Sequence, residues 1–253
     1  MNGKALALSL ISSLWLVACN DPPPKKNPFE PPPKTTAEVP KDAAAAKPAG
    51  PPELAIDDLG PKVGFSRILL DKPDGRDKLR AELTEAKQHF EGKEATLSVI
   101  RNAKLVWVTT LLSELGKIGA SKVIIKTETR KEFPAELAFT PEAKAPTPEA
   151  CAVVGMILDD RSAAIWKVGG GTAIKKAKGL AGPDLSMTSE TIERMAKACK
   201  ASNMFFVSAS DSVEWGLAYD LAASTRSIAD VKFETLVVLE KTPTAGRKVE
   251  LSK

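Results

Sequence analysis

Apolar and polar positions in the first half of the chain follow the periods of helices and strands between Lys62 and Phe133. Apolar residues recur at helical spacing in two stretches of this block, and the segments ATLSVI and SKVIIKT are typical of strands. The expected elements are a strand, a helix, a strand, a helix and a strand, at 65–70, 77–91, 95–100, 104–118 and 121–127. This half is therefore predicted to form a small α/β unit.

The second half, 151–253, shows a similar order. CAVVGMIL and SAAIWKV predict a hairpin, and a helix, a strand, a helix and a strand follow it. Trp215 stands 108 positions after Trp107, and each tryptophan lies close to the start of a predicted helix. We therefore expect a duplicated α/β fold of the two-layer α+β kind. It would have two tandem small domains at 62–133 and 151–253, each a mostly β sheet with two helices on one face, joined by a proline-containing linker at 134–150.

The N-terminal residues resemble an export signal. Met1–Lys4 is a short basic start, and the apolar run Ala5–Ala18 is shorter than the roughly 20 residues that cross a bilayer as a helix. The small residue before Cys19 is similar to the lipobox of bacterial lipoproteins, so cleavage after residues 1–18 and lipidation of Cys19 are expected. An ordinary signal peptide that contains a cysteine is the alternative. The expected location is the cell envelope, facing the periplasm, with the choice between inner and outer membrane left open.

Residues 19–61 contain 12 of the 19 prolines of the chain. Proline clusters favour extended conformations and bury too little apolar surface to order a chain, so this stretch is predicted to be a disordered tether. At roughly 3.1 Å per residue, the tether would reach on the order of 100 Å at most.

Two cysteines, Cys151 and Cys199, remain if Cys19 is lipidated. Cys151 begins a predicted strand and Cys199 lies near the end of a predicted helix, and an exported compartment permits a disulfide between them. Two buried, small apolar side chains are the alternative.

Catalytic and metal-binding chemistry is scarce in this composition. The single histidine, His89, lies beside an apolar helical position and is expected at the surface or at the boundary of the core. One histidine and two remaining cysteines provide neither zinc-ligand spacing nor a nucleophile with its base. We therefore expect no enzyme activity, no cofactor and no metal. The net charge of +4 is too small to indicate nucleic-acid binding.

The segment GGGTAIKKAK is a glycine-rich stretch followed by lysines. Ile174 occupies the position where a phosphate loop or a dinucleotide fingerprint requires glycine, so a flexible connection is expected. Lys175, Lys176 and Lys178 are candidate contacts for an anionic wall polymer or an acidic partner. A solvated face is the alternative.

The segment Val207–Gly216, VSASDSVEWG, resembles the strand-to-helix corner of the ExbD/TolR biopolymer-transport family. In that family an apolar strand ends in Ala-Asp, and a Val and then Tyr-Gly open the last helix. The segment Ile100–Trp107 fits the same frame more loosely, with tryptophan at the tyrosine position in both blocks. Ser210 departs from the family because it replaces the Asp. The resemblance covers about 160 residues.

The resemblance implies a function as well as a fold. Periplasmic domains of the family pair between subunits, so tandem copies would form an intrachain pseudo-dimer. Family members also carry a transmembrane helix with a proton-coupling acidic residue, and Ala5–Ala18 has no carboxylate, so no proton step is expected. The expected function is that of a non-catalytic envelope lipoprotein, an accessory or partner-binding component of proton-motive-force-driven biopolymer transport. Motor subunits or peptidoglycan are the expected partners besides the membrane that holds the lipid anchor.

A structural lipoprotein that binds peptidoglycan or protein and has no motor role is the alternative function. Within the corner, Ser210, Asp211 and Trp215 are candidate partner contacts. For Trp215, packing at the junction of helix and sheet is the favoured interpretation.

Overall fold

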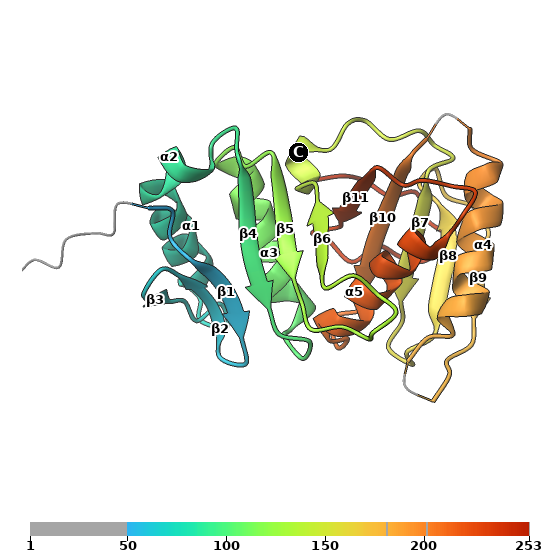
Figure 1. Ribbon diagram of the computed structural model, residues 1–253, viewed down its shortest axis with the longest axis horizontal. Coiled ribbons are helices and arrows are strands. Elements are labelled where there is room, and N and C mark those ends of the chain that lie inside the picture. Colours follow the sequence, from blue (N-terminus) through green and yellow to red (C-terminus); the bar gives the residue numbers. More distant parts are fainter. Residues whose placement is uncertain (1–49, 181, 201, 253) are drawn as a thin grey trace, which may run out of the picture. The chain divides into compact units, whose positions relative to one another are not determined.

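The computed structural model describes residues 50–180, 182–200 and 202–252. Their strands form two mixed β-sheets, one of six strands and one of five, and helices pack against both sheets (Figure 1). This is the α+β architecture with two sheet-bearing regions that the sequence predicts. Both sheets belong to one compact unit of the chain.

The first sheet has the strand order β3-β2-β1-β4-β5-β6. Strand β1 pairs in parallel with β4, and β4 pairs in parallel with β5, whereas β2, β3 and β6 are antiparallel to their neighbours. Its strands are β1 (Leu54–Asp57), β2 (Gly60–Val63), β3 (Ser66–Arg67), β4 (Glu94–Val99), β5 (Lys122–Lys126) and β6 (Glu136–Phe139). Its helices are α1 (Gly75–Glu85), α2 (Lys87–Phe90) and α3 (Leu105–Lys117), and a 3₁₀ turn, η1 (Glu142–Lys144), follows β6.

The second sheet has the order β11-β10-β7-β8-β9. Strands β7, β10 and β11 are parallel, and the hairpin strands β8 and β9 are antiparallel. Its strands are β7 (Val153–Ile157), β8 (Ala163–Lys167), β9 (Ile174–Lys176), β10 (Met204–Ala209) and β11 (Thr235–Val238). Its helices are α4 (Leu185–Lys197) and α5 (Trp215–Ser224), and the 3₁₀ turn η2 (Thr225–Ser227) follows α5.

The two sheets repeat one topology. The segments from β1 to β5 and from β7 to β11, called the first and second repeat below, both run through three antiparallel strands, a helical segment, a strand, a helix and a strand. Strand β4 begins at Glu94 and β10 at Met204, and α3 begins at Leu105 and α5 at Trp215, so equivalent residues stand 110 positions apart. The structural equivalent of Trp215 is therefore Leu105. The alignment of Trp107 with Trp215 is wrong by two residues.

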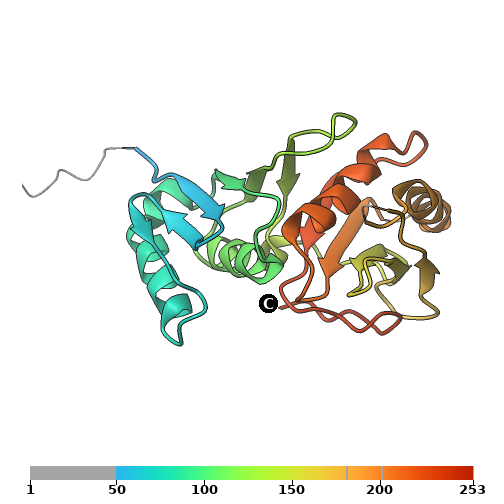
Figure 2. The ribbon, with the colours of Figure 1, turned by 90° about the horizontal axis from the view of Figure 1, so that it is seen from below.

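Burial differs between the sheets. In β4 buried apolar residues alternate with exposed polar ones, and in β5 the buried Val123 and Ile125 alternate with two exposed lysines and the half-buried Ile124. One face of the first sheet therefore contacts solvent. Strands β7 and β10 are buried on both faces, as their nearly continuous apolar sequences indicate. Figures 1 and 2 show α1 and α3 on one side of the first sheet, and α4 and α5 on the opposite side of the second. The other face of the second sheet packs against the C-terminal segment through Val249 and Leu251.

Several predicted boundaries are wrong. Strand β1 lies inside the predicted tether, 19–61, where the surrounding prolines masked its short apolar alternation. Strand β6 and η1 lie inside the predicted linker, 134–150, because Leu137 and Phe139 are buried beside β5. The rest of the tether, up to Ala49, and the signal segment lie outside the described residues.

Candidate functional site

The strand-to-helix corners of the two repeats contact each other and form what we call the inter-repeat junction. Lys104 and Glu214, which are equivalent positions, pair as an isolated antiparallel β-bridge. The amide N–H of Trp215 donates to the carbonyl of Ala103 at 2.9 Å, and that of Gly216 donates to the carbonyl of Arg101 at 2.7 Å. The first N–H groups of a helix have no partner within it, so the first repeat satisfies two such groups of α5.

Glycine at position 216 allows this close approach. A Cβ atom there would lie 3.0 Å from both the Cβ and the carbonyl oxygen of Arg101. The Tyr-Gly-like Trp215-Gly216 pair that the sequence singles out is therefore an element of contact between the repeats.

Trp215 fills the centre of the junction. Its side chain is fully buried, and its Nε1–H donates to Thr127 Oγ1 at 2.9 Å. The indole ring meets Phe139 and Tyr219 edge-on, with ring centroids 5.8 Å and 5.7 Å away. Thr127 follows β5, the last strand of the first repeat, and Phe139 ends β6, which pairs with β5. This side chain therefore connects the second repeat to the first sheet. The packing interpretation is confirmed, and the interpretation of Trp215 as a partner contact is wrong.

A buried ion pair lies beside the tryptophan. Asp220 on α5 is 0% exposed, and its carboxylate accepts from Arg101 at 2.7 Å and lies 3.5 Å from Arg130. The hydrogen bond to Asp220 raises the pKa of Arg101. Burial raises the pKa of the neighbouring Tyr219, whose hydroxyl donates to the carbonyl of Pro134. These groups hold the second repeat to the first.

A second charged cluster surrounds Glu114 on α3. Its buried carboxylate accepts from Arg76 at 2.9 Å and from Arg80 at 3.1 Å, and lies 3.0 Å from the ammonium of Lys117. Arg76 also donates to Glu240, which follows β11, so the cluster reaches the second repeat. Burial raises the pKa of Glu114, but hydrogen bonds from the three cations outweigh that effect and lower the pKa to about 2.

We expect Glu114→Gln to change how stability depends on pH. The pKa is lowered on folding from 4.5 to about 2, so the carboxylate stabilises the fold above pH 4.5, and this contribution is lost as pH falls toward 2. Urea unfolding measures how much the variant lowers the free energy of unfolding relative to the wild type. This loss should be about 2–3 kcal/mol larger at pH 7 than at pH 2.

The matched control for this change is Glu94→Gln, at an exposed position of β4. It should change the free energy of unfolding by less than about 0.5 kcal/mol at either pH. If Glu114→Gln lowered the free energy of unfolding equally at both pH values, the lowered pKa of Glu114 would be contradicted.

The other two predicted partner contacts in the corner, Ser210 and Asp211, differ in exposure. Ser210 is only 9% exposed, and its backbone N–H bonds to Ile157, so its assignment as a partner contact is wrong. Asp211 is exposed, and its carboxylate accepts from the hydroxyl of Thr242 at 2.8 Å. Of the predicted corner residues, Asp211 alone is placed to reach a partner.

The predicted lysine contacts lie on or next to β9, at the outer edge of the second sheet. Lys175 forms an ion pair with Asp160 at 2.8 Å. Lys175 and Lys178 are exposed, and Lys176 is partly exposed. The segment predicted to be a flexible connection thus contains the edge strand β9. After this strand, Lys178 and Pro183 form an isolated antiparallel β-bridge.

The cysteines Cys151 and Cys199 form a disulfide bond, with Cα atoms 5.5 Å apart. The bond connects the residues before β7 to the end of α4. The sequence permits this disulfide but leaves two buried, unbonded cysteines as the alternative. Cys19, the predicted site of lipidation, lies outside the described residues.

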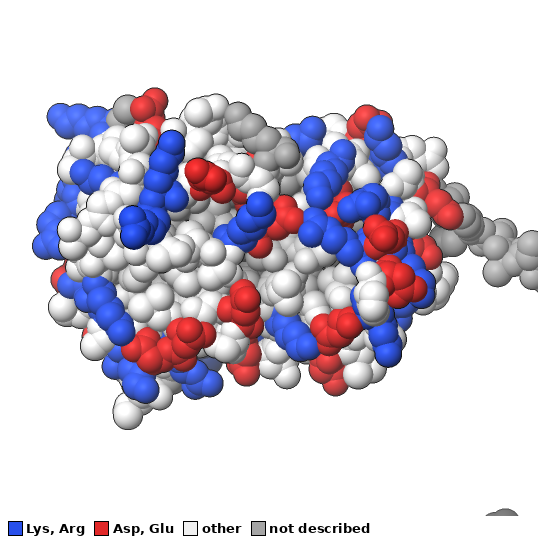
Figure 3. Space-filling model, turned by 180° about the vertical axis from the view of Figure 1, so that it is seen from behind, with Lys and Arg blue, Asp and Glu red and all other residues white. Residues whose placement is uncertain are grey.

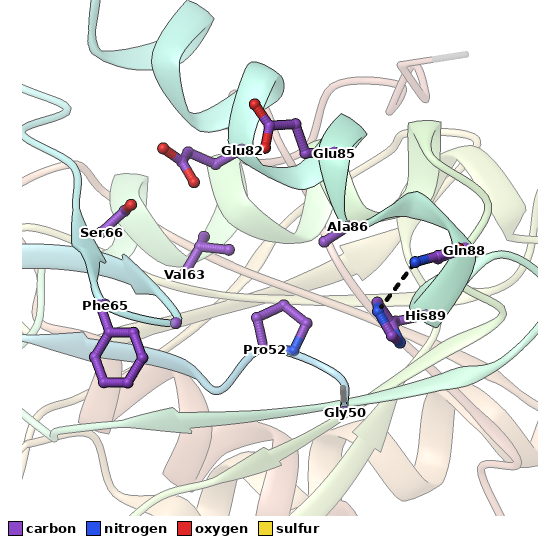
Figure 4. A pocket seen from close by; sticks show the side chains of 11 residues that line it. Gly50, Pro52, Val63, Phe65, Ser66, Glu82, Glu85, Ala86, Gln88 and His89 are labelled. Carbon is purple, nitrogen blue, oxygen red and sulfur yellow. Dashed lines mark hydrogen bonds between the residues drawn. The ribbon is translucent and has the colours of Figure 1, made fainter. Parts of the chain in front are cut away.

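A hollow of about 410 Å³, called the hairpin pocket, lies between the β2–β3 hairpin and the end of α1. Pro52, Val63 and Phe65 line it on the strand side (Figure 4). Phe65 is 97% exposed at the tip of the hairpin. Figure 4 shows Glu82 and His89 on the helix side. The pocket therefore has an exposed aromatic ring on its strand side and carboxylates on its helix side.

Sequence reasoning missed the residues that join the repeats. Arg101, Asp220 and Glu114 lie in segments predicted correctly as corners or helices, but nothing in their spacing shows which charges meet. A charged residue at an apolar helical position was the available signal: Asp220 stands three residues after Leu217, and Glu114 stands three residues after Leu111. The sequence predicts that Phe65 lies in a strand, whereas it lies at the tip of the β2–β3 hairpin.

Surface charge is mixed on the face seen in Figure 3, where basic and acidic side chains are interspersed. Within residues 50–180, 182–200 and 202–252, no group of three or more histidine, cysteine, aspartate or glutamate side chains is arranged to hold a metal ion. In the same ranges, no helix has the length and apolar character needed to cross a membrane. Comparisons of the chain with protein-family models, with curated proteins and with solved structures found no match.

Proposed function

We propose that the chain is a non-catalytic envelope lipoprotein that serves as an accessory, partner-binding component of proton-motive-force-driven biopolymer transport. The observation that carries the proposal is the repeated strand order of two halves that meet corner to corner. In the ExbD/TolR family, which the corner sequence resembles, the periplasmic domains pair between subunits. Here the two repeats of one chain would provide both members of such a pair, as an intrachain pseudo-dimer.

The edge strand β9 is the surface proposed to bind the partner. An edge strand offers backbone N–H and C=O groups to an extended segment, which can add to the sheet as a further strand. Lys176 and Lys178 would attract acidic side chains of that segment, while Lys175 is already paired with Asp160. This edge is distant from the inter-repeat junction in the strand order, so binding need not disturb the contact between the repeats.

Cross-linking in cells that express the chain tests the proposal. Motor subunits should be recovered with the chain, and the double variant Lys176→Glu with Lys178→Glu should lower their recovery at least about fivefold, because like charges repel an acidic partner. Lys122→Glu is the matched control, at an exposed lysine of β5 in the first sheet, and it should leave recovery unchanged. Light scattering on the purified chain should give the mass of one copy.

Two results would refute the proposal. Recovery of wall fragments alone would favour the structural lipoprotein that binds peptidoglycan. An obligate dimer formed through the two repeats would contradict the intrachain pair.

A further inference from the structure

The hairpin pocket has an acidic lining and lies beside an edge of the first sheet. Of the described residues that line it, two are glutamates, Glu82 and Glu85, and none is a lysine or an arginine. Ser66 of the edge strand β3 also lines the pocket. We propose that this pocket binds a lysine or arginine side chain of an extended segment of a partner protein, whose backbone lies along β3. This surface is separate from β9 and does not depend on the partner proposed for that edge.

Glu82 supplies the charge that the basic side chain meets. This residue of α1 is half-buried, and Figure 4 shows its side chain extending toward Ser66. Within residues 50–180, 182–200 and 202–252, no lysine or arginine forms a salt bridge with its carboxylate. A partly buried carboxylate without a counterion is unfavourable, so a cation placed here stabilises it. Glu85 already has an interaction within the chain and is given no part in binding.

The apolar lining suits the methylene stem of the same side chain. Pro52, Val63 and Ala86 line the pocket, and Phe65 is 97% exposed at the tip of the hairpin. Lysine and arginine bury their stems against apolar surface while the charged end stays beside polar groups. An aromatic ring such as that of Phe65 also attracts a cation that lies over its face. The volume of about 410 Å³ is within the range of hollows that bind ligands.

The sheet edge favours an extended protein segment over a free cation as the occupant. Strand β3 is the outermost strand of the first sheet, and an edge strand offers backbone N–H and C=O groups. In recognition by strand addition, such groups bind the backbone of the segment and pockets receive alternate side chains. Because Ser66 belongs to β3 and also lines the pocket, a segment paired with β3 can place one side chain against Glu82.

The two sheet edges of the chain select opposite charges. Strands β3 and β9 are the third antiparallel strands of their repeats and therefore equivalent edges. Lys176 lies on β9 and Lys178 follows it, whereas the hairpin pocket beside β3 has Glu82. Like charges repel, so the pocket should reject an acidic segment that β9 binds.

Peptide titrations of the full chain in detergent micelles test the proposal. The acetylated and amidated peptide Val-Thr-Arg-Thr-Val should shift the backbone amide NMR signals of Gly64, Ser66 and Gln88, with a Kd on the order of 1 mM. The same peptide with norleucine in place of arginine should bind at least about fivefold more weakly, because it lacks the charge. The peptide with glutamate at that position should leave these signals unchanged. Raising the salt concentration should weaken the binding of the arginine peptide.

Variants of the pocket separate the charge from the apolar contact. Glu82→Gln should weaken binding of the arginine peptide about fivefold and leave binding of the norleucine peptide unchanged. Its matched control is Glu190→Gln, at an exposed glutamate of α4, which should change neither. Phe65→Ser should weaken binding of the arginine peptide about tenfold, because an aromatic anchor carries much of the affinity in such contacts. Leu59→Ser, at an exposed residue of the β1–β2 turn, should leave it unchanged.

Three outcomes would overturn the proposal. Equal binding of the arginine and norleucine peptides would show that the pocket selects no charge. Free guanidinium chloride that shifted the same signals with an equal Kd would contradict the role of β3. Pocket signals that changed with protein concentration before any peptide was added would show that a second copy of the chain occupies the pocket.

Discussion

Replacing Trp215 with alanine is expected to lower the free energy of unfolding by about 3–5 kcal/mol. The indole is fully buried, meets Phe139 and Tyr219 edge-on, and donates to Thr127 Oγ1. Alanine would leave a cavity lined by both repeats and an unsatisfied Thr127 hydroxyl, and each adds to the cost. Urea unfolding followed by circular dichroism measures the effect.

The same substitution should also separate the unfolding of the two repeats. Because Trp215 contacts residues that follow β5 and lie on β6, its loss removes packing that couples the halves, and the single transition should split into two. Trp107→Ala is the control, because the indole of Trp107 donates to Asp71 within its own repeat. That variant should lose stability but keep one transition. A Trp215→Ala protein that loses less than about 1 kcal/mol would show that the junction contributes little.

Removing the disulfide is expected to cost about 4 kcal/mol. Cys151 and Cys199 are 48 positions apart, and a crosslink that closes a loop of this length lowers the entropy of the unfolded chain by a corresponding amount. The double variant Cys151→Ala with Cys199→Ala should therefore have a lower urea midpoint with little change in the native circular dichroism spectrum.

The wild type in reducing agent provides an independent check on the disulfide. It should match the double variant within about 1 kcal/mol, because both lack the crosslink. A reduced wild type as stable as the oxidised protein would mean that the bond adds nothing to stability, and the expected cost would then be wrong.

Periodicity alone identified most of the regular elements. Strands β4, β5, β7, β8 and β10 and helices α3 and α5 lie where apolar spacing predicts them. These elements are encoded locally, since strand alternation and helical spacing are properties of consecutive residues. The stop of α3 before Gly119 is also local, because this glycine has a φ of 102°, a conformation that other residues rarely adopt.

The misassigned segments are short and depend on neighbours. Strand β1 has four residues in a proline-rich context, and β6 has four residues between prolines. Neither is stable by itself. Each is ordered by pairing with another strand: β1 pairs with β4, which is distant in the sequence, and β6 pairs with the preceding strand β5.

The candidate site also has a part that the sequence predicts and a part that only the fold determines. Sequence patterns identified both corners, the duplication and the charged surface lysines. These features depend only on residues close together in the sequence, as do strand periods, helix starts and composition. They could not show that Glu214 pairs with Lys104, that Asp220 lies against Arg101, or that Trp215 is enclosed while Asp211 is exposed. The two charged pairs join residues more than 100 positions apart, and Trp215 donates to Thr127, 88 positions away. Only the packing of one repeat on the other brings these residues within hydrogen-bonding distance.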